Sequence, residues 1–494
     1  MRLVLVLFAL AAAGQAATLS DRIDKILSEP AARRSFWGIQ VVDLVSGRTL
    51  YQHNADRLFV PASTMKLLTT ALALARLGPD HRFVTRLAAE TPPDEEGRIA
   101  GDLALIGGGD PNLSARLLPF QERTAFASNR LQPLEDLAEQ VALLGIRQID
   151  GNIVGDDRAY VWERYGEGWT LEDTASASGA PVTALAFNDN TVTVRIRPGG
   201  KPGEPALVQM DPAGSYFSVQ NRTRTLAPGA SSRGIRIHRQ PAERTVRLSG
   251  EIALGSAGQS VLLAVDDPAL FAAQALREEL LRRSVQVRGR ALSRHAMPYE
   301  VDEVDKAVEA EPSYAFVLAS GSSMPLAEIL RVCNKASQNL HAEMLLRAVA
   351  ASRRGQGSFP AALTEWKVFL GEAGVSAQAY SLHDGSGLSR LNLVTPAALG
   401  ALLVWMWNSP HRQLWLDTLP VAGVDGTLRE RFRNTPAAHR LRAKTGLLAH
   451  VRALAGYLDA PGRRLALVIL ANHFQDSPAA RSLIDRLCLA MIEE

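Results

Sequence analysis

Residues 61–78 read PASTMKLLTTALALARLG, a run that is almost wholly apolar between Pro61 and Gly78. Proline at the start, glycine at the end and apolar residues between them predict a buried helix of about four to five turns. Its first turn carries Ser63 and Lys66, which share one face because residues three apart lie together on a helix. Burial lowers the pKa of a lysine, so a neutral amine could take the proton of the serine hydroxyl. The S-x-x-K pattern alone is common, and a lysine that reaches solvent is the alternative.

Two other motifs make this pattern a specific signal. Residues 337–339 form an S-x-N triplet, on or next to a helix, within NKASQNLHAEM. Residues 444–446 form a K-T-G triplet, which opens a strand, within AKTGLLAHV. The S-x-x-K, S-x-N and K-T-G elements, in this order, match the set found in penicillin-binding proteins and class A β-lactamases. We therefore predict a serine acyl-transfer site built from three distant segments.

The chain as a whole resembles the D-alanyl-D-alanine carboxypeptidase/endopeptidases of the penicillin-binding protein 4 type, the low-molecular-mass class C penicillin-binding proteins. Besides the three motifs, the resemblance includes GDLALIGGGDPNLS (101–114), HDGSGLSRLN (383–392) and LPVAGVDGTLRERF (419–432). The interval between Ser63 and Ser337 is far longer than a β-lactamase needs. The family places two additional domains in this interval.

The order of the predicted elements indicates a split domain. A strand and a helix come first, a long β-rich insertion follows, and helices, strands and a last helix end the chain, which suggests an α/β domain whose sheet uses both chain ends. The resemblance implies the same α/β class: a penicillin-recognising, transpeptidase-like catalytic domain, a β-sheet flanked by helices, with two inserted, mainly β domains. We expect a signal peptide at 1–16, the catalytic domain at 17–85 and 300–494, a β-rich insertion at 86–112 and 198–299, and a second insertion at 113–197.

The resemblance implies a catalytic role for each motif. Ser63 would be the acylated nucleophile and Lys66 its general base. Ser337 would relay the proton to the leaving D-alanine amine, and Asn339 would hold a substrate amide and the lysine. Lys444 would polarise the hydroxyl of Ser337 and add positive charge to the site.

The strand that carries the K-T-G triplet would bind substrate. Thr445 would bind the terminal carboxylate, with Gly446 and Leu447 as the next substrate-binding positions. The oxyanion hole would consist of the backbone N–H groups of Ser63 and Leu447, and loss of one such donor typically slows a reaction by about 10²–10³.

This strand departs from the family pattern K-T-G-T-L-S-G-V. Leu447, Ala449 and His450 stand where the family commonly has Thr, Ser and Gly. Because backbone donation does not depend on the side chain, we expect the oxyanion hole to persist. The hydroxyl contacts are lost, which affects substrate preference and turnover.

A charged pair would select the side chain of the third stem residue. A diaminopimelate side chain ends in both an amine and a carboxylate, so a selective pocket needs an acid and a base held apart. The resemblance assigns these roles to Arg390, which closes DGSGLSR, and Asp156, in IVGDD. Arginine suits a carboxylate because its planar guanidinium can donate two parallel hydrogen bonds. In the alternative, Arg390 pairs with a nearby acid such as Asp384 to shape its loop, and Asp156 has no part in binding.

The N-terminus predicts export. Arg2, an apolar run at 3–13 and the small residues Gly14 and Ala16 are typical of a secretory signal peptide that is cleaved after Ala16. The apolar run is too short to span a bilayer of about 30 Å, which argues against a membrane anchor. We therefore expect a periplasmic or secreted protein without an integral membrane segment after cleavage.

Composition limits the partners. The 54 basic and 51 acidic residues give a formal net charge of +3, and no basic run of the kind that binds nucleic acid stands out. The ten histidines lack ligand spacing, and LIGGGDPN lacks the G-x-x-x-x-G-K-[ST] of a phosphate-binding loop, so we expect neither a metal nor a cofactor. Cys333 and Cys488, both in apolar helical patterns, are interpreted as buried free thiols, with one disulfide as the alternative.

These features predict a serine-type D-Ala-D-Ala carboxypeptidase and DD-endopeptidase that acts on peptidoglycan stem peptides through an acyl-enzyme. β-Lactam antibiotics would acylate it. Two alternatives stay open. A β-lactamase would hydrolyse benzylpenicillin quickly, and the long insertion argues against it. A catalytically weak peptidoglycan-binding protein is favoured only by the altered strand after Lys444.

Overall fold

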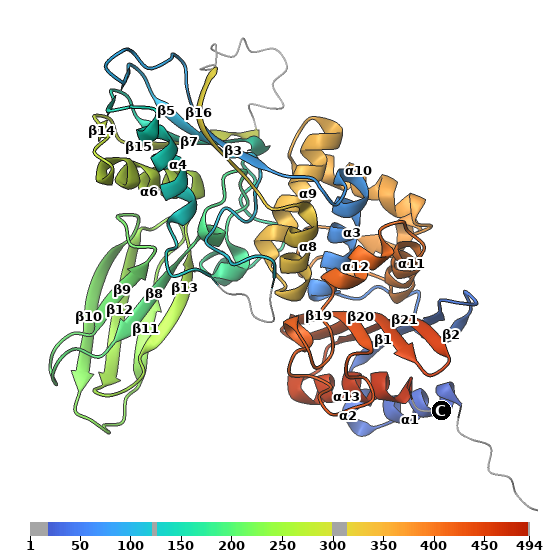
Figure 1. Ribbon diagram of the computed structural model, residues 1–494. Helices are drawn as coiled ribbons and strands as arrows, with labels where there is room; N and C mark the ends of the chain where they lie inside the picture. The colour runs from blue at the N-terminus through green and yellow to red at the C-terminus, as the bar shows by residue number, and fades with distance from the viewer. Residues whose placement is uncertain (1–17, 121–125, 299–313, 493–494) are drawn as a thin grey trace, which may run out of the picture.

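The computed structural model describes residues 18–120, 126–298 and 314–492, so the expected signal peptide at 1–16 lies outside the described residues. Figure 1 shows two lobes side by side, one built from both ends of the chain and the other from residues between them. In the first lobe, blue N-terminal elements lie beside red C-terminal ones. The α/β class predicted from the sequence is confirmed.

The first lobe contains a five-stranded antiparallel sheet in the order β19-β20-β21-β1-β2. The strands are β1 (Phe36–Asp43), β2 (Thr49–His53), β19 (Leu441–Leu448), β20 (Val451–Ala460) and β21 (Arg463–Asn472). β1 pairs with β21 along its whole length, from Phe36↔Asn472 to Asp43↔Leu465. Strands from the two chain ends therefore form one sheet, with β19 at its edge.

Helices cover both faces of this sheet. Successive residues of a strand point to opposite sides, so one strand can supply residues to two hydrophobic cores. In β21, Val468 and Leu470 pack into one hydrophobic core, whereas Leu467 and Ile469 pack into another. The second core lies under α1 (Leu19–Leu27), α2 (Pro30–Arg33) and α13 (Ser477–Ala490). The first core lies under α11 (Pro396–Trp407) and the helices behind it.

The helix predicted from the opening stretch is α3 (Met65–Leu77), and its residues from Met65 to Leu74 are all buried. One 3₁₀ turn, η1 (Ala62–Thr64), precedes it, and Gly78 ends it with a φ of 81°. Figure 1 shows α3 in the middle of the helical layer. The other helices of this layer are α8 (Leu326–Lys335), α9 (Asn339–Arg354), α10 (Phe359–Glu372) and α12 (Arg412–Thr418). α3 packs against α8 and α9, and Lys66 in its first turn contacts Asn339, the first residue of α9.

The second lobe begins with a mixed five-stranded sheet in the order β15-β7-β5-β3-β16. The strands are β3 (Val84–Ala89), β5 (Leu103–Ile106), β7 (Ile153–Val161), β15 (Ala291–Ala296) and β16 (Phe316–Ser322). Helices α4 (Gln132–Leu143) and α6 (Pro268–Arg282) pack against it. A small parallel sheet beside it contains β4 (Arg98–Ile99), β6 (Gln148–Ile149) and β14 (Gln286–Val287).

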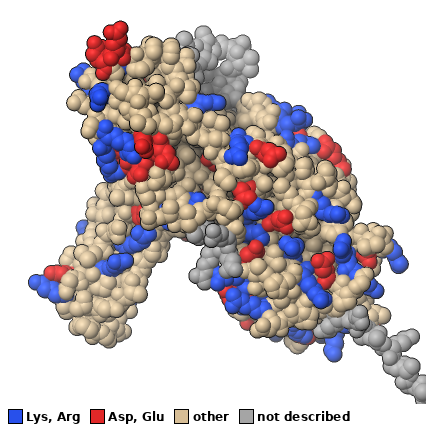
Figure 2. Space-filling model, in the orientation of Figure 1, with Lys and Arg blue, Asp and Glu red and all other residues tan. Residues whose placement is uncertain are grey.

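Two three-stranded sheets lie at the far end of the second lobe (Figure 1). One contains β8 (Thr191–Arg197), β9 (Leu207–Asp211) and β13 (Gln259–Ala264), and the other β10 (Ser218–Leu226), β11 (Gly234–His238) and β12 (Thr245–Ala253). The five-stranded sheet of the second lobe combines strands that the sequence analysis assigns to different domains. The domain boundaries stay a prediction. On the face drawn in Figure 2, basic and acidic side chains are interspersed over the first lobe.

Residues 162–190 connect the lobes and run along the helical layer of the first one. They include α5 (Leu171–Thr174), η2 (Ala177–Gly179) and η3 (Asn188–Asn190). On the facing side, β17 (Tyr380–Ser381) and β18 (Leu393–Val394) flank the loop that contains HDGSG, and η5 (Gly426–Leu428) lies beside β19. The segment 162–190 therefore lies near β19, the edge strand of the antiparallel sheet.

Candidate active site

A cleft of about 580 Å³ lies where the edge strand β19 meets the start of α3, the start of α9 and the connecting segment. Residues of all three motifs line it, together with side chains from α5, η5, β20 and α13. The lining consists of Ser63, Asp173, Ser178, Ser337, Asn339, Gly387, Leu388, Thr427, Glu430, Arg431, Thr445, Gly446, Leu447, Leu448, Arg452 and Arg481. The structure brings the predicted motifs into one site.

Lys66 is completely buried beside the hydroxyl of Ser63. Its Nζ lies 3.0 Å from Ser63 Oγ, 2.6 Å from Asn339 Oδ1 and 2.6 Å from the carbonyl oxygen of Ser386. Burial lowers the pKa of Lys66 to about 8. A neutral amine can donate two hydrogen bonds, to Asn339 and Ser386, and its lone pair then faces the Ser63 hydroxyl. This arrangement can deprotonate Ser63.

Lys444, on β19, forms the second buried lysine site. Its Nζ donates to Ser337 Oγ at 2.8 Å and to the carbonyl oxygen of Thr445 at 2.9 Å. Burial and the nearby charge of Lys66 hold the pKa of Lys444 well below its ordinary value. Ser337 is held in the left-handed region, with a φ of 58°, at the turn before α9. The two lysines therefore hold the hydroxyls of Ser63 and Ser337.

Close backbone packing fixes the turn that carries Ser63. A Cβ added to Gly387 would lie 1.9 Å from the carbonyl oxygen of Ala62, and one added to Gly446 would lie 2.8 Å from that of Pro61. Ala62 has a φ of 47°, a conformation that few residues other than glycine adopt. Gly446 is therefore needed for the approach of β19 to the nucleophile turn. The family resemblance alone indicates this glycine only as a substrate contact.

The connecting segment of the inserted region holds the S-x-N triplet. Asn339 accepts from Lys66 and donates through Nδ2 to the carbonyl oxygen of Ser178 at 2.8 Å. Gln338 donates to Asp189 at 3.0 Å, and Asp189 also pairs with the buried Arg116. The amide of Asn339 is thus oriented from both sides.

A buried carboxylate network supports the loop at 383–392. Asp384 accepts hydrogen bonds from the backbone N–H groups of Gly387 and Ser389 and from the side chains of Trp169 and Asn392. Sequence reasoning missed its role, although the segment HDGSGLSRLN was singled out.

Glu343, on α9, also supports the loop at 383–392. It accepts from the backbone N–H groups of Gly385 and Ser386, so it fixes the carbonyl that contacts Lys66. Burial, with the nearby charge of Asp384, raises the pKa of Glu343 to about 7. Glu343 belongs to none of the three motifs, and only its place one turn after Asn339 on the same helix indicates it.

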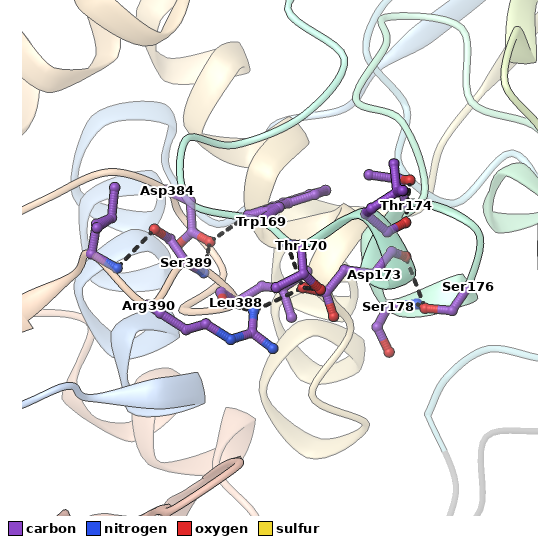
Figure 3. Close-up of polar contacts among 12 residues, drawn as sticks. Trp169, Thr170, Asp173, Thr174, Ser176, Ser178, Asp384, Leu388, Ser389 and Arg390 are labelled. Carbon is purple, nitrogen blue, oxygen red and sulfur yellow. Dashed lines mark hydrogen bonds and ion pairs between the residues drawn. The ribbon is translucent and has the colours of Figure 1, made fainter. Parts of the chain in front are cut away.

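The structure separates the two residues expected to select the substrate side chain. Arg390 forms an ion pair with Asp173 at 2.8 Å, rather than with Asp384 (Figure 3). Asp173 lines the cleft and lies on α5. Although burial opposes it, hydrogen bonds from Thr170 and Arg390 lower the pKa of Asp173, which keeps it ionised.

Asp156 does not line the cleft. It is buried in β7, in the second lobe, where its carboxylate pairs with Arg158 at 2.7 Å. The role expected for Asp156 stays a prediction, whereas Asp173, which comes 17 residues later in the sequence, lines the cleft. Nothing in the short segment LEDTASASG distinguished Asp173 from the other acids in the sequence.

The remaining observations concern metals, membranes and thiols. No group of three or more His, Cys, Asp or Glu side chains in the described part of the chain could hold a metal ion. Within the same residues, no helix has the length and apolar character of a membrane span. Cys333 and Cys488 are free and buried, as predicted.

Comparison with known proteins gives two kinds of match in sequence. The model of the D-Ala-D-Ala carboxypeptidase 3 (S13) family matches residues 19–491. The D-alanyl-D-alanine carboxypeptidase of Actinomadura sp. (strain R39) is 35% identical over 486 residues, which cover 96% of this chain and 84% of the relative. The D-alanyl-D-alanine carboxypeptidase DacB of Haemophilus influenzae is 25% identical over 447 residues, 88% of this chain and 85% of the relative.

Solved structures show the same fold. Penicillin-binding protein 4 (dacB) of Haemophilus influenzae superposes with a TM-score of 0.78 at 23% identity, covering 94% of this chain and 97% of that one. A structure of that protein in complex with a β-lactam gives a TM-score of 0.73 at 24% identity, with coverage of 95% and 97%.

Proposed function

This chain belongs to the D-Ala-D-Ala carboxypeptidase 3 (S13) family, and we propose that it releases the terminal D-alanine of peptidoglycan stem peptides through an acyl-enzyme on Ser63. The observation that carries the proposal is the buried amine of Lys66, 3.0 Å from Ser63 Oγ. The finer features are also proposals: the serine mechanism, endopeptidase activity on cross-links, acylation by β-lactams, and export to the periplasm or the medium.

Acylation begins with proton transfer from Ser63 to the neutral amine of Lys66. Oγ attacks the carbonyl carbon of the penultimate D-alanine, and the backbone N–H groups of Ser63 and Leu447 stabilise the oxyanion. When the intermediate collapses, the C–N bond breaks and Ser337 passes its proton to the leaving amine. Ser337 recovers a proton from protonated Lys66, which returns to the neutral amine. Lys444, 2.8 Å from Ser337 Oγ, supports that transfer.

Deacylation uses the same groups in reverse. A water molecule takes the place of the leaving amine, and Lys66 or Ser337 accepts its proton as it attacks the ester carbon. Breaking the ester bond returns the proton to Ser63 Oγ, so the free enzyme is regenerated without a cofactor or a metal.

Two parts of the cleft would bind the substrate on either side of the scissile bond. Thr445 Oγ1, which lies 2.7 Å from Thr427 Oγ1, would hold the terminal carboxylate. Asp173 and Arg390 would hold the amine and carboxylate at the end of a diaminopimelate side chain. A zwitterionic group can replace their mutual ion pair with one contact to each, which supports this assignment.

The proposal is tested by mass spectrometry of the intact protein after incubation with benzylpenicillin. We expect one stable adduct on the wild type and none on Ser63→Ala, and D-alanine release from a pentapeptide that disappears in the same variant. An adduct that survives Ser63→Ala would contradict the assignment of the nucleophile. Rapid turnover of benzylpenicillin without a lasting adduct would favour a β-lactamase instead.

A further inference from the structure

Three arginines lie together at one end of the cleft, and the mechanism above does not use them. Arg431 follows η5, Arg452 is the second residue of β20, and Arg481 lies on α13. We refer to these residues as the arginine cluster.

The arginine cluster carries more positive charge than its neighbours neutralise. Arg431 pairs with Asp485 on α13. Arg452 donates through Nε to Ser477 Oγ at 2.9 Å, and among the described residues neither Arg452 nor Arg481 forms an ion pair with a carboxylate.

Glu430 lines the cleft and directly precedes Arg431 in sequence, but it is already paired with other arginines. It contacts Arg429 at 3.4 Å and Arg433 at 2.8 Å. Burial, together with the charges of Arg431 and Arg481, lowers the pKa of Arg452. Like charges that repel one another in a partly buried site are stabilised by a bound anion.

The position of the arginine cluster indicates which anion fits. Lys444 and Gly446 face the nucleophile turn, so Thr445 and Leu447, which alternate with them, lie on the other face of β19. Arg452 is the register partner of Leu447 and shares that face. The cleft therefore passes from Ser63 around the edge strand, beyond Thr445, to the arginines.

We propose that the arginine cluster is a leaving-group subsite, which binds carboxylates of an acidic peptide released when a peptidoglycan cross-link is cut. This inference rests on the proposed function, in which Thr445 holds the carboxylate next to the scissile nitrogen. A free D-alanine carries only that one carboxylate. A leaving stem peptide carries further carboxylates, and two extended residues span about 7 Å, enough to pass Leu447 and reach Arg452.

Leu447 bears on the distinction between a free D-alanine and a leaving stem peptide. Leu447 is 56% exposed, and its hydrocarbon side chain cannot donate a hydrogen bond to a carboxylate. Beyond Thr445 on this face of β19, the guanidinium groups of the arginine cluster can donate such bonds. Guanidinium groups suit carboxylates because of their paired N–H donors.

The test uses the variant Arg452→Gln/Arg481→Gln, with Arg486→Gln as the matched control. Arg486 also lies on α13, but it pairs with Glu29 and does not line the cleft. Two peptides are compared: a cross-linked tetrapeptide dimer of the diaminopimelate type and a monomeric pentapeptide. Thermal melting checks that each variant is folded.

We expect the double variant to lower the ratio of dimer to pentapeptide kcat/KM by about tenfold, the low end for charge-assisted hydrogen bonds. The control should change this ratio by less than about twofold, and added salt should reduce the wild-type ratio because it screens exposed charges. An unchanged ratio in the double variant, or a wild type that cleaves the pentapeptide but not the dimer, would overturn the subsite.

A binding measurement separates failure of the subsite from failure of the proposed reaction. In the Ser63→Ala background, the dimer should bind about tenfold more weakly when both arginines are replaced, and the pentapeptide should be affected less. Equal affinities with and without the arginines would overturn the subsite even if the enzyme is active. If the wild type cleaves neither peptide but the arginine substitutions still weaken dimer binding, the subsite would be supported and the reaction rejected.

Discussion

The buried floor of the cleft and its exposed rim are held by different forces. At the floor, Lys66 and Lys444 are fully buried, and each bonds a serine hydroxyl. At the rim, the side chains of Arg390 and Asp173 are 40% and 16% exposed, so water screens their ion pair. A buried polar group that loses its partner has no water to replace it, whereas a rim charge does. The floor should therefore control whether the reaction occurs, and the rim should control which substrate reacts.

The largest expected effect is at the floor, in Lys66→Arg. Arginine keeps the positive charge but does not lose its proton in proteins, so it cannot act as the base. We expect acylation by benzylpenicillin to slow by at least about 10²-fold, the low end for loss of a general base. Stopped-flow or quenched labelling with a fluorescent penicillin measures this rate.

Lys335→Arg is the control for the structural cost of a buried substitution. Lys335 is also buried, but its ammonium pairs with Asp425 at 2.5 Å and lies outside the cleft lining. The acylation rate of the Lys335→Arg variant should stay near that of the wild type. If Lys66→Arg acylated at a similar rate, the base would have to be another group, with Ser337 the next candidate.

A smaller and more selective effect is expected at the rim. Arg390→Ala and Asp173→Asn should each lower kcat/KM for a diaminopimelate pentapeptide by about tenfold, or about 1.5 kcal/mol, since the pair is partly screened. Activity on a pentapeptide with a neutral third side chain should fall much less. The comparison is made by D-alanine release from both peptides.

Asp156→Asn provides the matched control for the acid. Its carboxylate pairs with Arg158 in the second lobe, so the substitution should lower thermal stability without changing the preference between the two peptides. Equal losses on both peptides in Arg390→Ala would mean that this arginine only supports its loop.

The floor could be predicted from sequence because its chemistry needs fixed spacing. Ser63 and Lys66 must be one helical turn apart to share a face, and the apolar residues of α3 indicate burial on their own. Ser337 and Lys444 followed from their triplets, and the structure places Lys444 Nζ 2.8 Å from Ser337 Oγ.

The rim could not be predicted in the same way. Asp173 reaches Arg390 through a tertiary contact between residues 217 apart, and no local periodicity specifies such a pair. The resemblance points instead to Asp156, which the structure places in a buried strand of the second lobe. The arginine cluster joins three separate elements, so its members share no motif.

The central claim is that the neutral amine of Lys66 is the base for Ser63, and the pH dependence of acylation tests it most directly. Because the pKa of Lys66 is lowered to about 8, the base is protonated at lower pH. The second-order rate constant for benzylpenicillin should therefore fall as pH falls through about 8. Glu343→Gln removes a buried carboxylate whose charge raises the pKa of Lys66, so this variant should keep the pH dependence and move its midpoint to lower pH. A rate constant that does not change from well below to well above pH 8 would contradict the claim.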